Sequence, residues 1–184
     1  MKPLLVWVQV LLVTLGILSL GYCAYVWFDA QEFQQRETYA LETTAPTETV
    51  PSIGADGLVG RIVISRLNVS VVVMEGTDRR ILRRAAGHIT GTALPGLPGN
   101  IGISAHRDTF FRPLRQILPG DLVTLETSRG SFRYRVVSTK IVNPTDLSVL
   151  TADGSQVLTL VTCYPFHFVG PAPSRFIVRA ERIS

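Results

Sequence analysis

Cysteine is scarce in this chain, with only two among 184 residues. Cys23 falls in an apolar N-terminal segment and Cys163 lies near the C-terminus, so we expect no disulfide between them. Cys163 therefore has to persist as a thiol, which favours a reactive role over that of a buried filler. Structural zinc is also excluded, because it takes four ligands and Cys163 has only His167 near it in sequence.

Charge is absent from the stretch Leu4 to Phe28. An α-helix rises about 1.5 Å per residue, so a helix of these twenty-five residues is longer than the roughly 30 Å hydrocarbon core of a bilayer. A cleaved signal peptide is the alternative, but its apolar region usually spans about 7–15 residues and ends in small side chains. This segment ends in Tyr25-Val26-Trp27-Phe28. The sequence therefore predicts an uncleaved transmembrane helix.

The charges that flank this helix predict its orientation. Lys2 and the α-amino group precede it, whereas Asp29 and Glu32 follow it and no basic residue appears before Arg36. Positive charge collects on the cytoplasmic side of a membrane. We therefore expect a single-pass protein of the plasma membrane with its N-terminus in the cytoplasm and the rest of the chain outside.

The remaining chain divides by composition into a linker and a domain. Residues 1–28 form the anchor, 29–57 an acidic, proline-bearing extracytoplasmic stalk, and 58–184 the domain. Residues 29–58 carry six acidic residues against one arginine, whereas residues 59–184 carry sixteen basic against eight acidic residues. A basic domain outside the cytoplasm favours an anionic partner such as phosphate-bearing lipid or wall polymer. We expect no nucleic acid partner, because the arginines are scattered over alternating strands.

The domain is rich in strand patterns. Short apolar and β-branched runs recur between turn residues, at 60–67, 69–74, 100–105, 121–127, 131–137, 157–162 and 175–180. Thr77 to Ala86 and Thr109 to Leu118 favour short helices between them. Such regular spacing predicts a mainly β fold that closes into a barrel.

Cys163 ends one of these strands, because Pro165 cannot donate to a β-ladder. A thiol with an ordinary pKa of about 8.5 needs a base or a cation beside it to act as a nucleophile at neutral pH. His106 closes the run Asn100 to Arg107, in which Asn100, Gly102, Ser104 and His106 share one face. Arg175 opens a strand whose Arg175, Ile177 and Arg179 face away from Phe176, Val178 and Ala180. Cys163 and Arg175 are then the facing ends of two strands joined by a loop.

The order of these motifs resembles the sortases. The runs that carry the resemblance are Gly99-Asn100-Ile101-Gly102-Ile103-Ser104-Ala105-His106-Arg107, then Thr159-Leu160-Val161-Thr162-Cys163, then Arg175 on the next strand. The continuations Asp108 to Leu114 and Tyr164-Pro165-Phe166 are most similar to class D. The resemblance covers residues 57–184 together with the anchor, and it implies a closed eight-stranded barrel with short helices.

The resemblance also implies roles for the residues. Cys163 is the nucleophile, His106 the acid and base, and Arg175 the donor to the oxyanion or to the substrate backbone. Thr162 and Ser104 are expected to bind the substrate. The donor in sortases is a C-terminal LPxTG-like sorting signal, and the acceptor is an amine of a cell-wall precursor or a pilin lysine.

Other interpretations stay open at this stage. A cysteine protease would use the same thiol and imidazole but hydrolyse its product, and a wall-binding barrel would not need Cys163 at all. We predict no cofactor and assign no metal ligand. Some sortases bind calcium, and Asp108, Glu126 and Asp153 are oxygen ligands, but no loop motif groups them. His88 is interpreted as structural.

Overall fold

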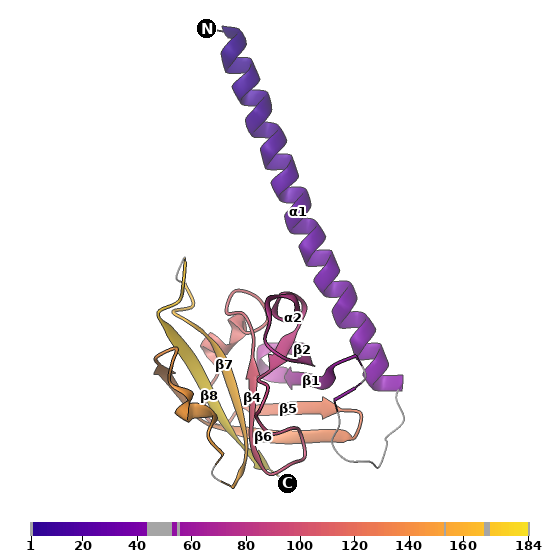
Figure 1. Cartoon of the computed structure of the whole chain (residues 1–184), viewed down its shortest axis with the longest axis vertical. Helices are drawn as coiled ribbons and strands as arrows, with labels where there is room; N and C mark the ends of the chain where they lie inside the picture. Colours follow the sequence, from indigo (N-terminus) through magenta and orange to yellow (C-terminus); the bar gives the residue numbers. More distant parts are fainter. Residues whose placement is uncertain (1, 44–52, 55, 153, 168–169, 184) are drawn as a thin grey trace.

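The computed structural model describes residues 2–43, 53–54, 56–152, 154–167 and 170–183. A long N-terminal helix stands against a barrel of strands (Figure 1). The helices are α1 (Lys2–Thr43) and α2 (Arg79–Arg84), with short 3-10 turns η1 (Ser65–Leu67), η2 (Arg112–Gln116) and η3 (Leu147–Leu150). The strands are β1 (Leu58–Ile64), β2 (Val69–Glu75), β3 (Ala86–His88), β4 (Gly99–Ser104), β5 (Leu122–Thr127), β6 (Gly130–Val142), β7 (Gln156–Tyr164) and β8 (Ser174–Ile183).

The eight strands close into one barrel in the order β1-β2-β3-β4-β7-β8-β6-β5, and β5 pairs with β1 to complete the ring. The predicted closed eight-stranded barrel is therefore confirmed. Closure leaves no long edge strand exposed. Most neighbours are antiparallel, but β2 with β3 and β4 with β7 are parallel.

Apolar side chains at alternate positions of the strands fill the inside of the barrel. Ile101 and Ile103 of β4 and Val178 and Ala180 of β8 belong to the central apolar cluster, whose buried members include Ile62, Ile64, Val71, Val73, Leu158 and Leu160. Each fully buried aliphatic side chain contributes about 1.5–3 kcal/mol relative to an exposed one. The faces predicted for β4 and β8 are confirmed, and the polar positions of both strands lie on the outside of the barrel.

The α1 helix continues beyond the apolar segment. It is one unbroken helix to Thr43, so the first part of the region predicted as a stalk is helical, while residues 44–52 and 55 lie outside the described part. Residues from Leu4 form a helix long and apolar enough to cross a membrane. The short helix predicted for Thr77 to Ala86 begins later and ends earlier, because Asp78 caps it and Ala86 joins β3.

Candidate active site

Cys163 and Arg175 lie opposite each other on adjacent strands. β7 and β8 are antiparallel, and their register pairs Cys163 directly with Arg175. Both side chains are partly exposed. The predicted facing of these two strand ends is confirmed. In Figure 1 the β7 end and the β8 start lie at the upper end of the barrel, on the side to which the N-terminal part of α1 projects.

His106 reaches the same end of the barrel through β4. The parallel register of β4 and β7 pairs Ser104 with Val161, and the Ala105 amide continues it by donating to the Val161 carbonyl at 3.2 Å. His106 lies two residues after Ser104, and Cys163 lies two residues after Val161. His106 is exposed, so its imidazole is open to solvent.

A hydrogen bond from Thr162 connects β7 to the segment that follows β4. Its hydroxyl donates to the Ala105 carbonyl at 2.7 Å, and the side chain is only 1% exposed. The residues before the thiol and before the imidazole are therefore tied to each other directly. Such a bond fixes the relative position of the two groups that follow it.

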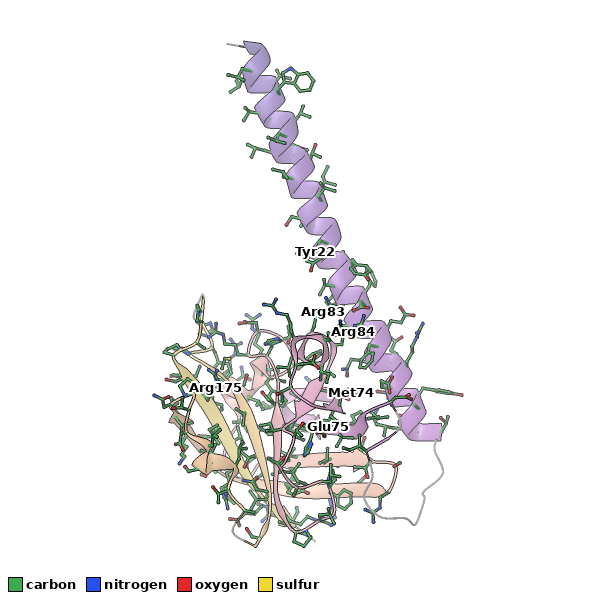
Figure 2. The ribbon with its side chains drawn as sticks, in the orientation of Figure 1. Tyr22, Met74, Glu75, Arg83, Arg84 and Arg175 are labelled. Atoms are coloured by element: carbon green, nitrogen blue, oxygen red, sulfur yellow. The ribbon has the colours of Figure 1, made fainter. Side chains whose placement is uncertain are left out.

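Arg175 points its guanidinium towards the loop that precedes it. Nη1 donates to the Ser174 carbonyl at 3.1 Å and approaches the Ala172 carbonyl at 3.4 Å. Figure 2 labels this side chain on the side of the barrel away from α1.

A groove of about 190 Å³ runs beside Arg175. β4 and β7 contribute Ser104 and Val161, and the β6–β7 connection covers them with Leu147 and Leu150. Ser104 is partly exposed. Arg175 and Ile177 of β8 complete this part of the lining, whereas Cys163 and His106 do not belong to it.

A model of the sortase domain matches residues 62–183 of this chain. The chain belongs to the sortase family. Sortases are cysteine transpeptidases, and the match contains all three residues that the resemblance assigned to catalysis.

Individual sortases are similar over most of the chain. Sortase D of Bacillus subtilis (strain 168) is 39% identical over 126 residues, which is 68% of this chain and 64% of that protein. A Clostridium perfringens sortase D5 transpeptidase of known structure has a TM-score of 0.63 and 27% identity, covering 82% of this chain and 88% of that one. Sortase C2 of Group B Streptococcus pilus island 1 has a TM-score of 0.67 and 26% identity, covering 84% and 97%.

No role was predicted for Arg107, a buried residue next to His106. Its side chain is buried, and Nη1 donates to the Pro165 carbonyl at 2.9 Å while Nη2 donates to the Gly170 carbonyl at 3.1 Å. Both acceptors belong to the connection between Cys163 and Arg175. One guanidinium therefore ties that connection to the residue next to His106. The signal available in the sequence was the position of Arg107 beside His106.

Three aromatic rings pack around the same connection. Phe166 lies 5.3 Å from Phe176 and 6.0 Å from Tyr164 between ring centroids, and both pairs meet edge to face. Tyr164 and Phe176 are stacked at 6.3 Å. Such pairs contribute about 0.5–1.5 kcal/mol beyond their buried area. The backbone on either side of Cys163 and Arg175 is thereby held firmly.

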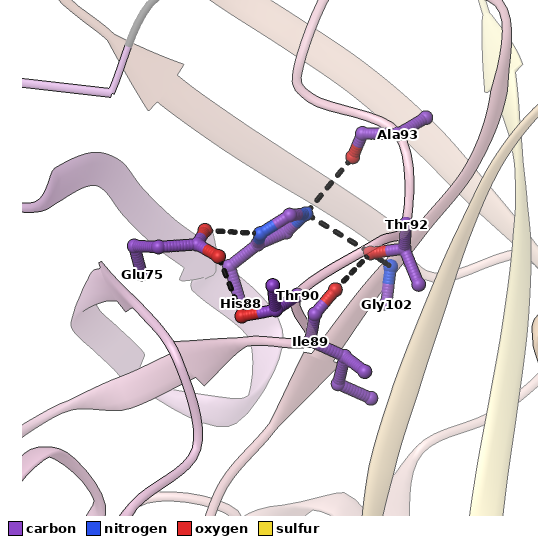
Figure 3. Close-up of polar contacts among 7 residues, drawn as sticks. All are labelled: Glu75, His88, Ile89, Thr90, Thr92, Ala93 and Gly102. Atoms are coloured by element: carbon purple, nitrogen blue, oxygen red, sulfur yellow. Dashed lines mark hydrogen bonds and ion pairs between the residues drawn. The ribbon is translucent and has the colours of Figure 1, made fainter.

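His88, unlike the exposed His106, lies within a network of polar contacts, which Figure 3 shows. It is buried, with Nδ1 2.5 Å from Glu75 Oε2 and Nε2 3.0 Å from the Ala93 carbonyl. Thr92 Oγ1 also lies 3.0 Å from Nε2 and accepts from the Gly102 amide at 3.1 Å. Both ring nitrogens are satisfied within the fold, as the structural interpretation of His88 expected.

No group of three or more His, Cys, Asp or Glu side chains that could hold a metal ion occurs among the residues the structure describes. Glu126 is bound to Arg61 at 2.7 Å. Asp108 approaches Arg107 at 3.5 Å. Asp153, the third carboxylate considered for calcium, lies outside the described residues.

Proposed function

We propose that this chain is a membrane-anchored sortase that cleaves a C-terminal LPxTG-like sorting signal and transfers the protein to an amine of the cell wall or of a pilin. The observation that carries the proposal is the meeting of three strand ends. Register places Cys163 opposite Arg175, and the parallel pairing of β4 with β7 brings His106 to the same rim.

The first step forms a thioester. The Cys163 sulfur, as thiolate, attacks the scissile carbonyl carbon, and the carbonyl oxygen takes up the negative charge. The C–N bond then breaks as protonated His106 gives its proton to the departing amine. The sorting signal's C-terminal fragment leaves, and the protein remains joined to Sγ.

The second step reverses the proton flow. An acceptor amine attacks the thioester carbon, neutral His106 takes the proton that this nitrogen releases, and the thiolate of Cys163 departs. The product contains a new amide bond. Water in place of the amine would give hydrolysis, so the groove has to favour the amine.

Arg175 supplies charge where the oxyanion develops. Its bonds to the Ser174 and Ala172 carbonyls, at 3.1 and 3.4 Å, lie at or beyond the long end of the usual range. A charge-assisted bond to an oxyanion is shorter and stronger than these. We infer that the guanidinium exchanges its carbonyl partners for the reacting oxygen or the substrate backbone.

The 190 Å³ groove is the proposed binding site of the donor peptide. Leu147 and Leu150 offer apolar contact, and Ser104 offers a hydroxyl in the same lining. Thr162 does not line the groove, but its bond to the Ala105 carbonyl holds β7 to the residue that follows Ser104. Substrate binding by Ser104 would be direct, whereas Thr162 would act by holding the strand.

The apolar part of α1 is the proposed anchor, oriented with its N-terminus in the cytoplasm. The hydropathy of the helix supports the anchor, and the flanking Lys2 and Asp29 support its orientation. Recovery of the full-length chain in the soluble fraction of its host cells would contradict the proposal.

The test of the activity uses the full-length chain in detergent micelles with a confirmed donor peptide and a free amine. Wild type should form the peptide–amine conjugate, whereas Cys163→Ala should form none while keeping its melting temperature. Mass spectrometry separates the conjugate from a hydrolysed peptide. Hydrolysis that persists at high amine concentration would identify a protease, and full turnover by Cys163→Ala would remove the thiol from the mechanism.

A further inference from the structure

The part of α1 that follows the apolar segment is docked on the barrel. Phe33 packs against Val72 and Met74 of β2 and against Ala85, which follows α2. The outer face of β2 is therefore covered by α1, while its inner face fills the barrel core. A helix held by an apolar contact of this kind keeps a fixed position relative to the strands.

Gln34 adds a specific polar clamp to this contact. Its Oε1 accepts from the Val72 amide at 2.8 Å, and its Nε2 donates to the Arg84 carbonyl at 2.6 Å. The ladder between β2 and β3 begins at Val73 and Ala86, one residue after Val72 and two residues after Arg84. The carboxamide thus bridges the two backbone segments just before their own pairing starts.

An ion pair fixes the height of α2 along α1. Arg84 Nε and Nη2 donate to the two carboxylate oxygens of Asp29 at 2.7 and 2.8 Å. Asp29 directly follows Phe28, the last residue of the uncharged segment. α2 therefore lies at the level where α1 would leave the membrane. Figure 2 shows Arg83 and Arg84 at the end of the barrel nearest to Tyr22.

Three other arginines of α2 are exposed, namely Arg79, Arg80 and Arg83. Within the described part of the chain none of the three forms an ion pair. The nearest carboxylate in sequence, Asp78, accepts from the amides of Arg80 and Ile81 as the helix cap. α2 therefore presents three guanidinium groups at the membrane level with no acidic side chain bound to them.

A groove of about 690 Å³ has Arg83 in its lining, whereas Arg79 and Arg80 lie outside that lining. Its walls are Tyr22, Val26 and Trp27 from α1, Arg83 from α2, and Phe110 and Pro113 from the segment after His106. The lining mixes these apolar side chains with polar ones such as Gln31 and Ser70, its charged residues are Arg83 and Asp108, and it continues from the apolar part of α1. A phospholipid has this combination of an anionic headgroup and apolar chains.

We propose that α2 and this groove bind anionic phospholipid headgroups of the outer leaflet. The guanidinium groups of Arg79, Arg80 and Arg83 pair with lipid phosphates, and Arg83 holds one lipid at the mouth of the groove. Because the chain is already tethered, this binding sets the orientation of the barrel. It keeps the end of the barrel that carries Cys163 turned towards the membrane surface. The proposal rests on the membrane anchoring proposed above.

The test uses the full-length chain in lipid nanodiscs that carry a trace of photoactivatable phosphatidylglycerol or of the matching phosphatidylcholine probe. The measured quantity is the yield of crosslinks on the peptide that contains α2. We expect it to be at least about fivefold higher with the anionic probe, since one basic residue near an anionic surface contributes roughly that factor. Arg79→Gln, Arg80→Gln and Arg83→Gln together should abolish the difference without changing transpeptidation in detergent.

The matched control replaces Arg129, Arg133 and Arg135 with Gln, which removes the same charge from exposed positions of the β5–β6 hairpin. This variant should keep the crosslinks on α2. Equal yields from both probes in wild type would overturn the proposal. Soluble polyphosphate serves as a stand-in for an anionic wall polymer. If it lowers the crosslink yield on α2 while the two lipid probes give equal yields, the proposal is also overturned. A chain that fails to enter the discs would instead contradict the anchor itself.

Discussion

His88 ends β3 and His106 follows β4, the next strand along the chain, yet their surroundings differ. His88 is buried, and each of its ring nitrogens faces an oxygen, whereas His106 is exposed on a rim. Burial makes an unpaired polar group costly, so the fold satisfies His88 completely. A catalytic group instead has to stay open to its substrate. The difference teaches that residues around His88 should control stability, and residues around Cys163 should control turnover.

The strongest test of this division is Arg175→Lys. If Arg175 donates two directed hydrogen bonds to an oxyanion or to the substrate backbone, lysine cannot reproduce its planar fork, and losing one such donor costs on the order of 10²–10³ in kcat. The melting temperature should stay unchanged because Arg175 is partly exposed. Transpeptidation and a melting curve measure both quantities.

Arg179→Lys is the control for that variant, since Arg179 shares the outer face of β8 but lies farther from Cys163 along the strand. Its activity should fall much less. Near-normal turnover by folded Arg175→Lys would show that Arg175 is not a catalytic residue, and it would weaken the separation between residues that control stability and residues that control turnover.

The next largest effect is expected at Arg107. Its side chain is buried and hydrogen-bonded like that of His88, but it contacts the connection between Cys163 and Arg175. Arg107→Met removes the donors of the Pro165 and Gly170 carbonyls and frees the connection between Cys163 and Arg175. Misplacement of reacting groups by about 1 Å can cost roughly 10²-fold, so we expect kcat to fall about 10- to 100-fold. Arg107→Lys should restore little, because one ammonium does not reproduce the two-pronged contact.

A positioning role predicts that kcat falls more than KM rises in Arg107→Met, and that the rate of thiol labelling at Cys163 changes. Arg112→Met, at an exposed position of η2, is the control and should leave both unchanged. Unaltered kcat with a lowered melting temperature would assign Arg107 to stability alone.

Around His88 the expected effect is on stability. Glu75→Ala removes the acceptor of His88 Nδ1 and of the Thr90 hydroxyl, which lies 2.7 Å from Glu75 Oε1. Leaving a buried polar group unsatisfied costs about 1–3 kcal/mol. Denaturant unfolding should show this loss, while kcat of the folded variant at room temperature should change less than threefold. Glu181→Ala, an exposed carboxylate on β8, should unfold like wild type. A large fall in kcat for Glu75→Ala would contradict the division.

Sequence patterns predicted a closed barrel and the pairing of Cys163 with Arg175 because both depend on local alternation and strand ends, whereas the eight strands and the catalytic roles were implied by the resemblance to sortases. The period of two in β4 and β8 gave the faces of Ile103 and Val178, and Pro165 marked the end of β7. Long-range contacts were missed. Nothing in the polar composition after Phe28 indicated that Gln34 would meet Val72. Arg107 was missed because its acceptors are backbone carbonyls of a distant loop, which leave no trace in side-chain patterns.

The smallest expected effect concerns acid pH and an ion pair far in sequence from either histidine. Arg66 donates to both carboxylate oxygens of Asp121 at 2.5 Å, and the Leu118 amide donates to Oδ2 at 2.8 Å. The bond from Arg66 is the main cause that lowers the pKa of Asp121 below its ordinary value of 3.8. A carboxyl whose pKa is lower in the folded state stabilises the protein at neutral pH, and this contribution is lost as the pH falls from about 4 through the folded pKa.

Asp121→Asn measures this contribution, because the amide oxygen can still accept from Leu118 but does not titrate. At pH 7 the variant should be less stable by about 0.2–1 kcal/mol, the usual range for a pair with one exposed partner. Since wild-type Asp121 becomes neutral in acid, the difference in unfolding free energy should shrink as the pH falls below 4 and through the lowered pKa of folded Asp121. kcat at neutral pH should not change, because Asp121 contacts neither Cys163 nor the connection that Arg107 holds. A difference that stays constant from pH 7 to pH 2 would show that the ion pair contributes nothing to acid sensitivity.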